Sequence, residues 1–101
     1  MATREESQQR ENLIQAKNTA ELMQRFVAMH VDLIKKFYPT LPLATKQRLV
    51  PEINFILQEG RVSDQVKRLM AGDEDKRVEI ARRVLYFHKA GVFGTTKANS
   101  A

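Results

Sequence analysis

Apolar residues recur at helical spacing along most of this chain and nowhere alternate with polar residues over the length of a strand. The clearest case is segment 22–37, whose apolar side is formed by residues three and four apart: Leu22, Phe26, His30, Leu33 and Phe37. We predict one amphipathic helix over this segment. It should end near Tyr38, because Pro39 disfavours helical geometry in the residue before it.

Capping residues mark further helix ends. Asn18, followed three residues later by Glu21, has the spacing of a capping box, and Ser63 precedes another helical segment. Gly60 suits a left-handed C-terminal cap between them. Asn18 either starts a new helix or lies within a long first one, and we favour a break at this residue.

The segment around Pro51 leaves two interpretations open. Thr40 or Thr45 is placed to cap a helix that continues through Leu49 and Ile53 to Glu59. Pro51 would then interrupt the hydrogen bonding of that helix and kink it. The alternative is a short turn before Pro51 and a new helix that starts with it.

The last predicted helix begins at a cluster of three acids, Asp73 to Asp75, which favour the positive end of a helix. Lys89 and Gly91 mark its end. Its predicted inward residues are Val78, Ala81, Val84, Leu85 and Phe87, and those of the short helix after Ser63 are Val66, Leu69 and Met70. Val92 and Phe93 are placed to fold back onto the core.

These segments predict an all-α fold, a compact bundle of four to five short helices joined by short loops. We expect a flexible N-terminal segment over residues 1–10, a single helical domain over 11–93 and a flexible tail over 94–101. A length of 101 residues with 43% apolar side chains fits one such domain.

The composition narrows the class of function. The chain has no cysteine, which excludes disulfides, thiolate catalysis and cysteine-ligated metals. No apolar run approaches the roughly 20 residues that span a bilayer. The first ten residues resemble neither a secretory signal nor a transit peptide, so we expect an intracellular protein, cytoplasmic or nuclear, without a membrane partner.

Candidate catalytic groups are sparse. The chain has two histidines, His30 and His88, and neither has a second metal-binding residue at local helical spacing. We expect both to lie at the edge of the core. No nucleophile motif, paired carboxylates or glycine-rich phosphate loop is present, and we therefore predict a protein that is not an enzyme and takes no cofactor or metal.

Our first functional hypothesis is a non-catalytic helical domain that docks a protein, as a small regulator or adaptor subunit and with transcription as one setting. A second copy of the chain is one candidate partner. Apolar anchors on such a surface would be steered by a basic rim. The candidate anchors are Met23, Met29, Phe55 and Phe93, although the core of a small bundle also needs such residues.

The alternative hypothesis is a nucleic-acid-binding regulatory protein. The formal net charge is +5, and no acid interrupts the sequence between Asp32 and Glu52. Contacts with phosphates would come from this stretch and from one side of the last helix, namely Lys35, Lys36, Lys46, Arg48, Lys76, Arg82, Arg83, Tyr86 and Lys89. The same side chains also serve as an ordinary solvated surface.

Overall fold

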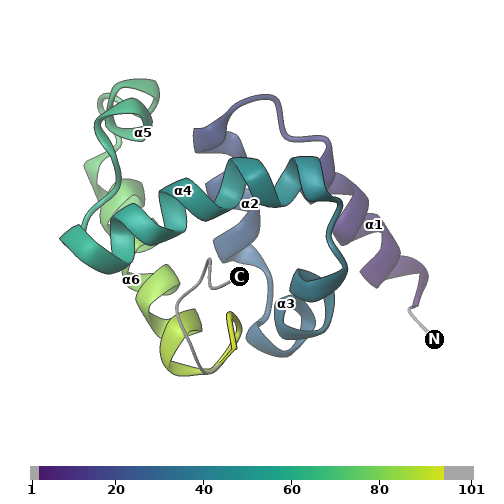
Figure 1. Ribbon diagram of the computed structural model, residues 1–101. Helices are drawn as coiled ribbons and strands as arrows, with labels where there is room; N and C mark the ends of the chain where they lie inside the picture. Colours follow the sequence, from purple (N-terminus) through teal and green to yellow (C-terminus); the bar gives the residue numbers. More distant parts are fainter. Residues whose placement is uncertain (1–2, 95–101) are drawn as a thin grey trace.

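A computed structural model describes residues 3–94, which fold into helices and contain no strand. The described part holds six α-helices and one short 3-10 turn, rather than four to five helices (Figure 1). Their bounds are α1 (Arg4–Ile14), α2 (Thr19–Ala28), α3 (Val31–Phe37), η1 (Tyr38–Thr40), α4 (Leu43–Glu59), α5 (Asp64–Leu69) and α6 (Glu74–Lys89). None of these helices is both long and apolar enough to cross a membrane.

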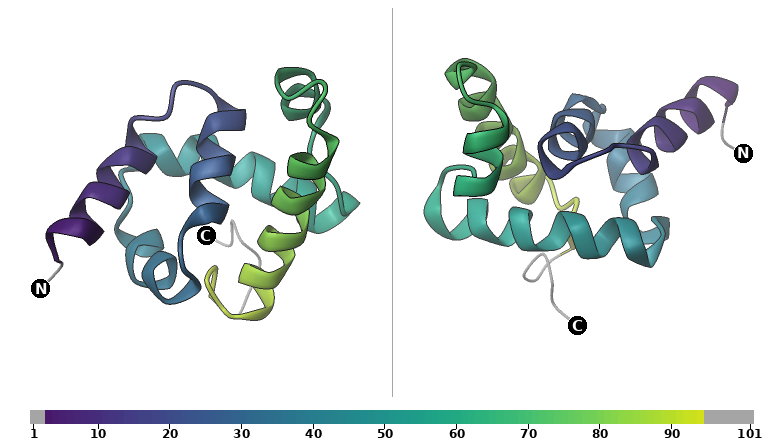
Figure 2. Two further views of the ribbon diagram at one scale, coloured as in Figure 1. Left: turned by 180° about the vertical axis from the view of Figure 1, so that it is seen from behind. Right: turned by 90° about the horizontal axis from the view of Figure 1, so that it is seen from above.

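The helices surround α2. The long helix α4 crosses in front of α2 (Figure 1). Helices α1 and α3 lie toward one end of α4, and α5 and α6 lie toward its other end, as the view from above in Figure 2 also shows. Helix α2 contacts α1, α4, α5 and α6. Its central position follows from its composition, because Leu22, Met23 and Phe26 are fully buried.

Aromatic rings fill the core where α2, α6 and the end of the described chain meet. The ring centroid of Phe26 lies 5.4 Å from that of Phe87 and 6.1 Å from that of Phe93. Phe93 reaches this position because Gly91 takes a left-handed conformation, φ 84°, and Val92 N–H donates to the carbonyl of Phe87. The prediction that Val92 and Phe93 fold back onto the core is confirmed.

The predicted single helix over 22–37 is wrong, because the chain breaks between α2 and α3. Met29 is extended, with ψ 146°, and the His30 side chain caps α3 by accepting a hydrogen bond from Asp32 N–H at 3.2 Å. The guanidinium of Arg83 donates hydrogen bonds to the carbonyls of Val27 and Met29, because the break leaves these carbonyls without helical donors. The predicted end near Tyr38 holds, since α3 ends at Phe37.

The N-terminal segment, expected to be flexible over residues 1–10, is helical from Arg4. Thr3 and Glu6 form a capping box in which each backbone N–H donates to the other's side chain. The Lys36 ammonium lies 3.3 Å from the Glu6 carboxylate, and Arg10 donates to the carbonyl of Thr40. The expectation of flexibility rested on the lack of apolar anchors in this segment, and these polar contacts are the ones that join its helical part to α3 and η1. Residues 95–101 of the expected tail lie outside the described residues.

Helix α4 is continuous through Pro51, so the proline does not start a separate helix. The helix begins after Pro42, and neither Thr40 nor Thr45 caps it; Thr45 is buried within its first turns. Pro51 is exposed, so its ring does not have to fit into the core. Gly60 ends α4 in the left-handed conformation, φ 75°, as predicted.

The predicted N-cap of α5 and the predicted start of α6 are confirmed. Asn18 also caps α2, although Glu21 accepts from Lys17 N–H rather than from Asn18 N–H. Ser63 caps α5 and its hydroxyl donates to Glu52, a carboxylate that is buried within α4 and also accepts from Ser63 N–H. Asp73 caps α6.

Two predicted core residues of these helices are exposed. Val78 is 48% exposed because Ile80 belongs to the buried side of α6, and a residue two positions away lies on the opposite side of a helix. Leu69 is 49% exposed at the last position of α5. Ala81, Val84 and Phe87 are buried as predicted, whereas Leu85 is half-buried.

Candidate functional site

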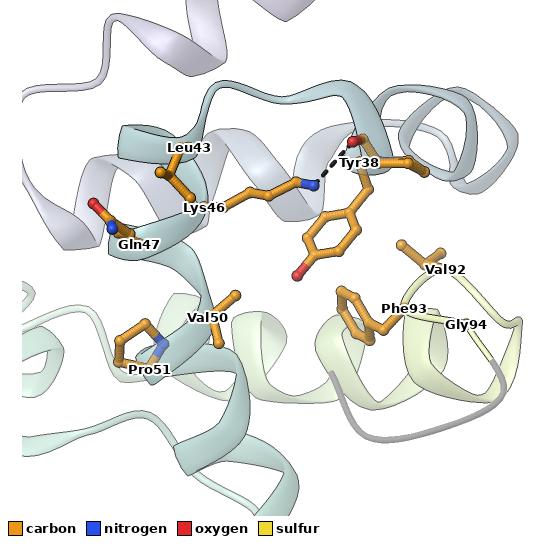
Figure 3. Close-up of a pocket in the computed structure, with 10 residues that line it drawn as sticks. Tyr38, Leu43, Lys46, Gln47, Val50, Pro51, Val92, Phe93 and Gly94 are labelled. Carbon is orange, nitrogen blue, oxygen red and sulfur yellow. Dashed lines mark hydrogen bonds between the residues drawn. The ribbon is translucent and has the colours of Figure 1, made fainter. Parts of the chain in front are cut away.

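A groove of about 630 Å³ runs along the first half of α4 (Figure 3). We call it the α4 groove. Its lining comes from η1, from α4 and from the turn formed by residues 91–94, and comprises Tyr38, Pro39, Leu43, Lys46, Gln47, Val50, Pro51, Val92, Phe93 and Gly94.

The α4 side of the groove is set by helical spacing. Leu43, Lys46 and Val50 are three and four residues apart and therefore share one face of the helix. Leu43 is the first residue of α4 and is 70% exposed, the largest value among the exposed large apolar side chains described. The helix therefore offers an apolar side chain to solvent at the edge of an apolar groove, the arrangement expected of a contact surface.

Two rings form the opposite side. The centroids of Tyr38 and Phe93 lie 5.1 Å apart in an edge-to-face arrangement, and both side chains are largely buried. Burial raises the pKa of the Tyr38 hydroxyl above its ordinary value. The rings are fixed by the core behind them, because both also pack against Phe26.

Polar groups gather beside the Tyr38 ring. The Lys46 ammonium donates to the carbonyl of Pro39 at 2.9 Å and lies 5.7 Å from the Tyr38 centroid. Figure 3 shows the Tyr38 hydroxyl directed into the space between Val50 and Phe93. We call Tyr38 and Lys46 the polar corner of the groove.

No acidic residue lines the α4 groove. The sequence around it, from residue 33 to residue 51, carries only basic charges. Lys35 lies beside the turn at the groove's end, since its Cε is 3.8 Å from the position that a Cβ on Gly91 would take. The lining of the groove therefore holds one charged side chain, the basic Lys46.

The candidate apolar anchors lie mostly in the core. Met23, Met29 and Phe93 are 0%, 4% and 7% exposed, so they serve packing rather than an open surface. Phe55 is half-buried with the Arg61 guanidinium 5.1 Å from its ring centroid. Only Phe93 of this set lines the groove. Sequence reasoning did not identify Leu43 as a candidate anchor. The feature that could have identified it is its position directly after Pro42, at the start of a helix.

The candidate phosphate-binding residues lie on three helices. Three of them make contacts within the fold. The Lys36 ammonium pairs with the Glu6 carboxylate, and the Lys46 ammonium donates to the carbonyl of Pro39. The Arg83 guanidinium donates to the two carbonyls at the break after α2. Tyr86 is 46% exposed, with the Arg83 guanidinium 5.2 Å from its ring centroid. The others are divided among α3, α4 and α6, namely Lys35, Arg48, Lys76, Arg82 and Lys89.

A second cavity, of about 570 Å³, lies between the α4–α5 connection and α6. Its charges are mixed, since Asp64 and Glu74 lie among its basic residues. Two of those basic residues are engaged in the fold: Arg61 bonds Asp64 and the carbonyl of Val62, and Arg77 bonds the carbonyl of Met70. The lining of this cavity therefore carries both signs of charge, unlike that of the α4 groove.

Both histidines are exposed, whereas the sequence predicts them at the edge of the core. His30 is exposed and caps α3, and His88 is exposed with its ring 6.4 Å from that of Phe93. Among residues 3–94 no group of three or more histidine or acidic side chains is placed so that it could hold a metal ion. Comparison of the chain with models of protein families, with curated proteins and with solved structures gives no match.

Proposed function

We propose that this protein is a non-catalytic helical docking domain, a small regulator or adaptor subunit that binds another protein through the α4 groove. The observation that supports the proposal is Leu43, a large apolar side chain that is 70% exposed at the edge of an apolar groove. Complete burial of a leucine side chain is worth about 1.5–3 kcal/mol, so a partner that covers it gains substantially.

The fold favours one mode of docking. A partner strand needs a sheet edge, and residues 3–94 contain no strand. Recognition of proline-rich segments uses open aromatic faces, whereas Tyr38 and Phe93 are 7% exposed. A partner helix needs only an apolar groove for residues one turn apart, which the α4 groove provides. We therefore propose a helix as the docked element.

The test uses two synthetic amphipathic helices of about 18 residues, a length at which isolated helices become stable enough to study. Both carry the same leucine face, and their polar faces differ only in having Glu or Gln. Each is titrated into the full-length protein labelled with nitrogen-15. We expect at least one peptide to bind and to shift the amide signals of Gln47, Val50 and Gly94.

Matched variants locate the site. Leu43→Gln should weaken binding about tenfold, because it removes an apolar contact at the groove. Val78→Gln makes the same type of change at an exposed residue of α6 and should leave the affinity unchanged. If neither peptide binds at about millimolar concentration, or if both variants bind equally well, the proposal is wrong.

Phosphate binding is the weaker proposal. Its candidate residues lie on three helices, and two of them, Lys36 and Arg83, are engaged in contacts within the fold. The acids at the start of α6, Glu74 and Asp75, would also repel phosphates near Lys76.

A further inference from the structure

We infer that the partner helix is acidic and places a carboxylate on the polar corner while its apolar anchor covers Leu43 and Val50. This inference rests on the proposed docking function and specifies the chemistry of the partner. It is carried by the arrangement of the groove, in which one polar corner adjoins an otherwise apolar lining.

The first argument is the pair of donors in the polar corner. The Tyr38 hydroxyl is directed into the groove and has no side-chain hydrogen bond to another described residue. The Lys46 ammonium uses one of its donors on the Pro39 carbonyl, and an ammonium has three. The inference places the partner's carboxylate where it accepts from both groups, because hydrogen bonds that involve charged groups are the stronger ones.

The second argument is the sign of the surrounding charge. The groove has no acidic lining residue, and Lys35 lies next to its end. A negative partner helix would be attracted, whereas a basic one would be repelled. Because the polar corner adjoins the apolar lining, the carboxylate belongs within about one turn of the anchor, a rise of about 5.4 Å.

The same charges argue against a second copy of this chain as the occupant. In a twofold symmetric dimer the same surface faces itself, so the two α4 grooves would bring Lys46 and Lys35 of both copies together. The net charge of +5 on each copy adds to this repulsion. An acidic helix meets neither obstacle.

The peptide pair described above tests the inference, since the two differ only in Glu against Gln. At about 50 mM salt we expect the Glu peptide to bind the full-length protein at least tenfold more tightly, which corresponds to about 1.4 kcal/mol. Tyr38→Phe and Lys46→Gln should each reduce this ratio. Lys76→Gln removes the same charge from α6 and should lower the ratio much less.

The outcomes separate the two proposals. Equal affinities for the Glu and Gln peptides, with Leu43-dependent binding, overturn the acidic partner and leave the docking function in place. A ratio that Lys76→Gln lowers as much as Lys46→Gln shows attraction by net charge alone and also overturns the polar corner. Concentration-dependent dimerisation that Leu43→Gln abolishes would replace the acidic helix by a second copy. Circular dichroism and thermal unfolding of each variant confirm that it folds.

Discussion

At the scale of single residues, Arg83 shows how a surface charge can belong to the fold. Its side chain donates to the carbonyls of Val27 and Met29 and lies 4.9 Å from the ring centroid of Phe87. Sequence alone placed Arg83 with Arg82 among the phosphate contacts. The structure separates these neighbours, since Arg83 is half-buried and Arg82 is exposed.

Arg83→Gln should therefore lower the free energy of unfolding by about 2 kcal/mol, because the two carbonyls lose their donors. Arg83→Lys should recover less than half of this loss, since an ammonium does not reproduce the fork of a guanidinium. Arg82→Gln should change it by no more than about 0.5 kcal/mol. Urea unfolding measures all three, and equal effects at the two positions would contradict the assigned role.

Tyr38 predicts a pH dependence at the same scale. Burial raises the pKa of its hydroxyl in the folded state above the ordinary value of 10.0. The folded protein thus holds this proton more tightly than the unfolded chain does. The resulting stabilisation is fully present below pH 10.0 and is lost as the pH rises through the folded-state pKa.

The expected result is that the unfolding free energy of the wild-type protein falls more steeply above pH 10.0 than that of Tyr38→Phe, which lacks the titrating group. Chemical unfolding of both proteins between neutral and strongly alkaline pH provides the comparison. Parallel curves would mean that the Tyr38 hydroxyl is as accessible in the folded protein as in the unfolded chain.

At the scale of elements, local signals predicted helix ends well and helix continuity poorly. The caps at Asn18 and Ser63 and the glycine at residue 60 act within one turn, so their effect is readable from a few neighbouring residues. The break at Met29 depends on Arg83, which comes more than fifty residues later in the chain. No local pattern contains that contact.

Helix α4 gives a prediction about Pro51. Within a helix interior proline removes a hydrogen bond and crowds the carbonyl four residues before it, here that of Gln47. Pro51→Ala restores an N–H donor and a better helix former, while it gives the unfolded chain more freedom. We expect the restored helix to prevail, with a net gain of about 1 kcal/mol and a rise in Tm of about 4–8 °C.

Gln58→Ala is the matched control, because Gln58 is exposed in the same helix and alanine there replaces another good helix former. Calorimetry of the two variants should show a clear rise in Tm for Pro51→Ala alone. A lower Tm for Pro51→Ala would show that the proline ring, which lines the α4 groove, contributes more by packing than it costs in hydrogen bonding.

At the scale of the whole molecule, the candidate site combines parts that are distant in the sequence. The α4 groove joins η1, α4 and the turn at 91–94, and its two rings come from Tyr38 and Phe93. Helical periodicity identified apolar faces within each helix, but it cannot show which faces the other helices cover. For this reason the predicted anchors Met23 and Met29 are buried, whereas Leu43, which the pattern does not distinguish, is exposed.

The distribution of charge over the molecule decides how strongly it should bind nucleic acid. Because Lys36 and Arg83 are engaged within the fold and the other candidates lie on three helices, we expect contact with fewer than about three phosphates of a duplex. Each neutralised phosphate contributes about −0.9 to the slope of log affinity against log salt, so the slope should be shallower than about −2.7. Affinity for a labelled duplex should then fall less than about 40-fold between about 50 and 200 mM salt.

Fluorescence anisotropy measures this slope directly, with the triple variant Lys76→Gln, Arg82→Gln, Lys89→Gln beside the wild type. These cations all belong to α6 and lie outside the α4 groove, so their loss leaves the docking surface intact. A steep slope that the triple variant removes would show that α6 gathers phosphates in solution. Nucleic-acid binding would then replace protein docking as the better account, because so strong a response to salt requires a concentrated basic surface.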